Sequence, residues 1–173
     1  MILFVFEGAE REPRVFRTLE RLFFGQGERI VCSFGNNIYE LYRQLQEFNG
    51  DGDIVSILRE NRADLPEGVK TSDFSEIDLF FDYDFQNENL SLEEMNVRLR
   101  EMLAMFDDET DNGKLYVSYP MVESLCYTRE LPDEHFVEYT VLRCDCMERS
   151  FKDIAREFSW QYGLYRTAGC RAP

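Results

Sequence analysis

Three acidic side chains directly follow two apolar runs of this chain. Residues 2–6 end at Glu7, and residues 77–81 end at Asp82, with Asp84 two positions further on. Each run has the length and composition of a buried strand. In an open α/β sheet, the carboxyl ends of parallel strands share one rim, and chemistry collects there. If the two strands are neighbours, that rim holds three carboxylates, whose oxygens suit a hard cation such as Mg²⁺ or Mn²⁺.

The spacing of the acids predicts a role for each of them. Asp82 and Asp84 are two residues apart, so an extended backbone points both side chains the same way, and they bind one cation directly and through water. Glu7 supplies a third ligand or acts as general base on an attacking water. Gly8 leaves room for a phosphate beside the backbone. The alternative is that acids after strands are ordinary loop residues, because short motifs such as D-x-D recur by chance.

Basic side chains near the same rim are candidates for holding a phosphate group. A helix is predicted to open at Glu12 and Pro13, so Arg11 and Arg14 lie at its start. Lys114, just before a later strand, is a further candidate phosphate contact. Such cations also pair with neighbouring acids on solvated helix faces, so both interpretations stay open.

The elements that must position these residues follow a β-α-β-α-α-β-α-β-α order, which predicts a four-stranded, mainly parallel sheet flanked by helices. The predicted strands are residues 2–6, 29–34, 77–81 and 115–118. Asn36 and Asn37 are predicted to cap the helix after the second strand. Ser91 and Glu94 form a capping box that starts the helix after the third.

The predicted α/β domain covers residues 1–128, and residues 129–173 form a mostly helical C-terminal extension. Within it, residues 136–142 fit a strand or a helix, and Ser150 is predicted to cap a last amphipathic helix. Cys144, Cys146 and Cys170 invite a zinc interpretation, but their spacing differs from that of the usual paired ligands.

The bulk composition limits the classes of function. The chain has 173 residues, a net charge of −15 and five cysteines. Nucleic-acid-binding proteins usually carry a basic stripe, so a polyanionic substrate would need a bridging metal, a local basic patch or another subunit. No export signal and no membrane-spanning run are apparent, and an odd number of cysteines is typical of reduced thiols. We therefore expect a cytoplasmic protein with no membrane partner.

Three motifs resemble a known family. Residues 7–16 resemble the E-G-x-x-x-E-P-x-x-F signature of RloB-like proteins, which belong to the TOPRIM superfamily with the OLD-type nucleases. Residues 80–84 resemble the D-x-D strand of that superfamily, and residues 118–123 resemble the S-x-P-x-x-E segment of the RloB-like branch. The order of strands and helices agrees over residues 1–128.

The resemblance implies a TOPRIM-like, Rossmannoid fold with Glu7, Asp82 and Asp84 in the catalytic and Mg²⁺-binding positions. It also implies cleavage or transfer at nucleic-acid phosphodiesters, in a family associated with restriction and phage defence. Glu10 and Glu123 become candidates for acids that contact the metal-binding residues without binding the metal themselves. Glu10 could instead interact with the dipole of the first helix, and Glu123 could be a solvent-facing helix residue.

Two other functions remain open from the residues. The net charge of −15 favours a non-catalytic acidic module on a TOPRIM-like scaffold that binds a basic protein partner. Alternatively, Asp82 could be the phosphate acceptor of a phosphatase that resembles the haloacid-dehalogenase class, with Ser118 after the next strand. That class usually carries its D-x-D on the first strand, which differs from the position here.

Overall fold

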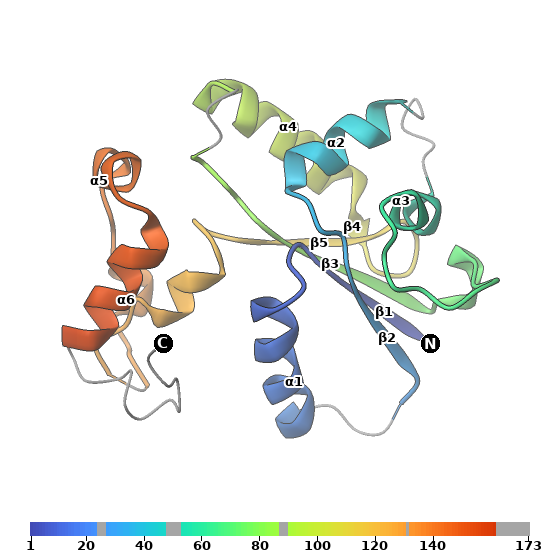
Figure 1. Ribbon diagram of the computed structural model, residues 1–173, viewed down its shortest axis with the longest axis horizontal. Helices are drawn as coiled ribbons and strands as arrows, with labels where there is room; N and C mark the ends of the chain where they lie inside the picture. Colours follow the sequence, from blue (N-terminus) through green and yellow to red (C-terminus); the bar gives the residue numbers. More distant parts are fainter. Residues whose placement is uncertain (24–26, 48–52, 87–89, 131, 162–173) are drawn as a thin grey trace. The chain divides into compact units, whose positions relative to one another are not determined.

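The computed structural model describes residues 1–23, 27–47, 53–86, 90–130 and 132–161 (Figure 1). The chain divides into two compact units, Met1–Ser118 and Tyr119–Pro173. The sequence places the boundary after residue 128, whereas the structure groups residues 119–128 with the C-terminal unit.

The first unit is built on a five-stranded sheet. Its strands are β1 (Ile2–Phe6), β2 (Arg29–Ser33), β3 (Glu76–Asp82), β4 (Asp107–Asp108) and β5 (Gly113–Ser118), in the spatial order β2-β1-β3-β5-β4. All neighbouring pairs are parallel except β4 with β5. The α/β class and the four parallel strands agree with the prediction. The strand number is wrong by one, because β4 is two acidic residues with no apolar pattern.

Helices α2 (Ile38–Glu47), α3 (Ile54–Glu60) and α4 (Leu92–Met105) cover one face of the sheet (Figure 1). The apolar residues of each helix repeat every 3.6 positions and so lie on one side of it, where they pack on every second residue of the strands. The core includes Leu3, Val5, Leu41, Leu45, Ile57, Leu58, Leu79, Phe81, Met95 and Met102, all almost fully buried.

Helix α1 (Arg11–Phe23) lies on the opposite face (Figure 1). A smaller aromatic cluster fixes it there, in which Phe16 packs on Phe4 and Phe6 of β1 with ring centroids 4.4 and 5.5 Å apart. Strand β1 is therefore buried on both faces, as its continuous apolar run predicts.

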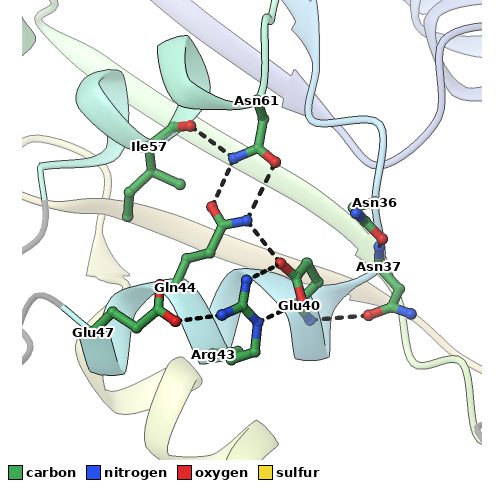
Figure 2. Close-up of polar contacts among 8 residues, drawn as sticks. All are labelled: Asn36, Asn37, Glu40, Arg43, Gln44, Glu47, Ile57 and Asn61. Atoms are coloured by element: carbon green, nitrogen blue, oxygen red, sulfur yellow. Dashed lines mark hydrogen bonds and ion pairs between the residues drawn. The ribbon is translucent and has the colours of Figure 1, made fainter.

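Polar contacts cap the start of α2 and join α2 to the end of α3 (Figure 2). Asn37 accepts from the backbone amide of Glu40 at 3.0 Å, which confirms its predicted cap, whereas Asn36 accepts from the backbone amide of Asn37 at 3.3 Å, before the helix begins. Asn61, which ends α3, exchanges two hydrogen bonds with the buried Gln44 of α2, at 2.6 and 3.2 Å. Asn61 also donates to the carbonyl of Ile57. The Ser91–Glu94 capping box likewise starts α4.

The second unit is helical in its described part. It contains the 3₁₀ turns η2 (Val122–Cys126) and η3 (Phe136–Glu138) and the helices α5 (Arg143–Glu148) and α6 (Phe151–Gln161). Residues 136–142, for which the sequence fits a strand or a helix, form a 3₁₀ turn followed by extended chain. The Ser150 hydroxyl accepts from the backbone amide of Asp153, which confirms the predicted cap. A third 3₁₀ turn, η1 (Thr71–Asp73), precedes β3 in the first unit.

Across the described ranges, none of the helices combines the length and the apolar character that crossing a lipid bilayer requires.

Candidate active site

The two acid-ending strands are direct neighbours. Strand β1 pairs with β3 in parallel, with Phe6 opposite Phe80, and the backbone amide of Glu7 continues the ladder by donating to the Phe80 carbonyl at 3.0 Å. The amide of Asp82 then donates to Oε2 of Glu7 at 3.0 Å. The expected adjacency is therefore confirmed, and the Glu7 side chain lies over the end of β3.

The electrostatic environment of Glu7 is strongly acidic. Burial raises its pKa to about 8, the hydrogen bond from the Asp82 amide opposes this rise, and the carboxylates of Asp82, Asp84 and Glu12 add to it. A carboxyl with this pKa keeps a proton at neutral pH in the absence of a cation. Crowded carboxylates of this kind favour a bound positive charge.

Asp84 departs from the predicted geometry. Strand β3 ends at Asp82, and Asp84 has a φ of 47°, in the left-handed region. The expectation that Asp82 and Asp84 point the same way from extended backbone is therefore wrong. The turn is held by its neighbours, since Tyr83 and Phe85 are both buried and the Tyr39 hydroxyl donates to the Tyr83 carbonyl at 2.8 Å. A left-handed conformation is unfavourable for a non-glycine residue, so the surrounding contacts must hold Asp84 in it.

Glu12 is a fourth acid at this site, and the sequence assigns it only to the opening of α1. Its carboxylate acts on the pKa of Glu7, and a Cβ added to Gly8 would come within 2.9 Å of its Oε2. Gly8 therefore leaves space for the Glu12 carboxylate, in addition to the predicted room for a phosphate. The signal was present in the spacing of Glu7 and Glu12 within the E-G-x-x-x-E-P pattern.

The candidate phosphate contacts on α1 are exposed. Arg11 is the first residue of the helix, and Arg14 lies one turn further on, where it lines a shallow cavity of about 440 Å³ with Arg17, Thr18 and Glu20. Glu10, just before the helix, is also exposed. These positions leave the arginines accessible to a ligand on this side of α1.

Lys114 lies away from the rim. It is opposite Asp78 in the β3–β5 register, whereas the rim residue Asp82 is opposite Ser118, four residues or about 13 Å along the strand. Its ammonium pairs with Glu109 at 3.2 Å. Lys114 is therefore near the start of β5, and the strand reaches the rim only at its other end, so a phosphate contact from Lys114 would not lie at the rim.

The remaining candidates belong to the second unit. Glu123 is buried in η2, with Oε1 3.6 Å from Nζ of Lys152, so it does not face solvent. Cys144 is exposed and Cys146 is buried on α5, and Cys170 lies outside the described residues.

The donor set fits a hard divalent cation in its chemistry. The side chains that raise the pKa of Glu7, those of Asp82, Asp84 and Glu12, all offer carboxylate oxygens as ligands. The side chain of Asp82 is only 7% exposed. Mg²⁺ takes oxygen ligands and keeps several of its waters, so it needs only one or two protein carboxylates. Within the described ranges, no three acidic, histidine or cysteine side chains already converge on a common point for a metal ion.

Comparisons with protein-family models, with curated proteins and with solved structures gave no match to this chain. The functional assignment therefore depends on the site itself.

Proposed function

We propose that this protein is a TOPRIM-like, Mg²⁺-dependent (or Mn²⁺-dependent) nuclease or related phosphoryl-transfer enzyme that acts on nucleic acid. The observation that carries the proposal is the hydrogen bond from the Asp82 amide to Glu7, which holds one carboxyl at the end of β3, where the carboxylates of Asp82, Asp84 and Glu12 raise its pKa. The resemblance of residues 7–16 to RloB-like proteins, and of residues 80–84 to the D-x-D strand of the TOPRIM superfamily, supports the same assignment.

Each residue has a distinct part in this proposal. Asp82 and Asp84 would hold the cation, which when bound would stabilise negative charge on a phosphate. Glu7 would exchange a proton with the attacking or leaving oxygen, because its raised pKa of about 8 lets it hold or release a proton near neutral pH. Gly8 and the exposed Arg11 and Arg14 would admit and hold the substrate phosphate.

The test is a calorimetric titration of the full chain with Mn²⁺, followed by cleavage assays on duplex DNA, single-stranded DNA and RNA with and without EDTA. We expect Asp82→Asn to abolish Mn²⁺ binding and to lower metal-dependent cleavage by at least about a hundredfold. Glu67→Gln, which removes an exposed carboxylate from a loop, is the matched control and should retain both. Unchanged Mn²⁺ affinity and cleavage in Asp82→Asn would exclude the proposal.

A further inference from the structure

The outer half of the sheet face that carries α1 exposes an aromatic ring. Phe16 of α1 packs on Phe4 and Phe6 of β1, so this helix covers the β1 part of the face. On the neighbouring strands, Phe80 of β3 is only partly buried and Tyr116 of β5 is 41% exposed. A large exposed aromatic on a sheet face is a feature of interaction surfaces.

Stacking on a neighbouring aromatic ring holds the Tyr116 ring in place. Tyr116 is opposite Phe80 in the β3–β5 register, and the two rings stack with centroids 5.1 Å apart and planes 13° apart. Phe80 in turn stacks on Phe6 at 5.1 Å and 18°. The stack runs from the buried β1 strand to the exposed ring, so Tyr116 is a rigid platform that loses little conformational entropy when a partner binds.

The charge around this platform is negative. Burial and the carboxylates of Glu76, Asp78 and Glu109 raise the pKa of Tyr116, and the ammonium group of Lys114 opposes this rise. Lys114 already pairs with Glu109. Burial first, and then the carboxylates of Glu76 and Glu109, raise the pKa of Asp78 to about 6, and Lys114 only partly opposes this rise.

We propose that this face, formed by Phe80, Tyr116, Glu76, Asp78 and Glu109, binds an arginine side chain from a basic segment of a partner protein. A guanidinium group can stack flat on Tyr116 and donate hydrogen bonds to a flanking carboxylate at the same time, which a lysine ammonium cannot match. A nucleic-acid strand would bring phosphates against the same carboxylates, so the charge selects a cationic partner. The proposal does not depend on the catalytic activity of the rim.

The experiment measures fluorescence anisotropy of a labelled peptide of alternating glycine and arginine, mixed with the full chain. A glycine–lysine peptide of the same length and a single-stranded oligonucleotide are the comparison probes. We expect the arginine peptide to bind more tightly than the lysine peptide. Tyr116→Leu and Asp78→Asn should each weaken arginine-peptide binding by about three- to fivefold, whereas Tyr116→Phe, which keeps the ring, should not.

Glu60→Gln is the matched charge control, because Glu60 is an exposed carboxylate on α3, which packs on the opposite sheet face. It should leave arginine-peptide binding unchanged. Equal effects of Asp78→Asn and Glu60→Gln would overturn the proposal, since binding would then follow net charge alone. So would equal affinity of Tyr116→Leu and the unaltered chain for the arginine peptide. Loss of oligonucleotide binding in Tyr116→Leu, with peptide binding intact, would overturn it in favour of base stacking.

Discussion

The backbone amide of Asp82 donates a hydrogen bond to the Glu7 carboxylate at 3.0 Å, and this bond joins the ends of two parallel strands that are 75 residues apart in sequence. Because the donor belongs to the backbone, substitution of the Asp82 side chain leaves the bond possible. The two residues can therefore be tested separately: Asp82 variants report on its carboxylate, and Glu7 variants report on the partly buried acceptor.

Glu7→Gln should stabilise the metal-free protein while weakening metal binding. The glutamine carbonyl can still accept from the Asp82 amide, but the side chain can no longer ionise. In the unaltered chain the pKa of Glu7 is about 8 in the folded state, above the usual 4.5. The contribution of Glu7 to stability is therefore complete below about pH 4.5, and it is lost as the pH rises to about 8. At about pH 8 in EDTA, we expect urea unfolding of Glu7→Gln to show a gain of about 3 kcal/mol.

The same variant should bind Mn²⁺ at least about tenfold more weakly in a calorimetric titration. Glu67→Gln serves again as the control for the loss of one negative charge. A Glu7→Gln protein that is no more stable in EDTA and binds Mn²⁺ normally would show that this carboxyl is an ordinary buried acceptor.

Gly8→Ala should disturb the site with little effect on the fold. The new Cβ would come within 2.9 Å of Glu12 Oε2, the flexible end of a side chain that can move away. We expect the free energy of unfolding to change by less than about 0.5 kcal/mol and Mn²⁺ affinity to fall by about tenfold. Gly113→Ala is the contrasting control, because a φ of 107° and contacts of 3.0–3.3 Å with Ile77 should cost about 2 kcal/mol. A large loss of stability in Gly8→Ala would contradict this account.

Asp84→Gly and Asp84→Ala should separate backbone conformation from carboxylate chemistry. Both substitutions remove the carboxylate, so both should lower Mn²⁺ affinity alike. Only alanine opposes the left-handed φ of 47°, so Asp84→Ala should unfold at lower urea, with a deficit of about 1 kcal/mol relative to Asp84→Gly. Equal stability of the two variants would mean that the turn relaxes out of the left-handed region when the acid is removed.

Asp78→Asn should flatten part of the pH dependence of stability. Glu76, Glu109, Lys114 and Tyr116 face this carboxyl, and its pKa of about 6 exceeds the usual 3.8. The contribution of Asp78 to stability is therefore complete below about pH 3.8 and is lost as the pH rises to about 6. Because Asp78 is only half-buried, solvent screening limits the effect.

Between about pH 5 and pH 7.5, we expect the stability difference in favour of Asp78→Asn to grow by about 1 kcal/mol, measured by urea unfolding. Glu60→Gln, measured in parallel, corrects for the change in net charge. A difference that stays constant with pH would show that Asp78 titrates normally.

The sheet could be predicted from sequence because its four parallel strands carry apolar runs and its helices carry stripes at helical spacing. Leu3, Val5 and Leu79 are buried where those runs place them. Strand β4 could not be predicted, because Asp107 and Asp108 form strand contacts only through their pairing with β5. Pairing of this kind depends on tertiary position rather than on local preference.

The site was predicted in part. The adjacency of Glu7 and Asp82 follows from parallel pairing of buried strands, which the apolar patterns already indicate. The left-handed turn at Asp84 does not follow, because it depends on Tyr83 and Phe85 being buried on both sides of it. The E-G-x-x-x-E-P spacing brings Glu12 close to Gly8 in sequence, but the approach of its carboxylate to Gly8 also depends on how α1 leaves the sheet.

The two-residue β4 has a consequence for the behaviour of concentrated protein. Both of its side chains, Asp107 and Asp108, are exposed acids at the outermost strand of the sheet. An edge so short and so charged is a poor template for backbone pairing with another chain. A second copy that approached along β4 would set like charges against each other, which disfavours sheet extension along this strand.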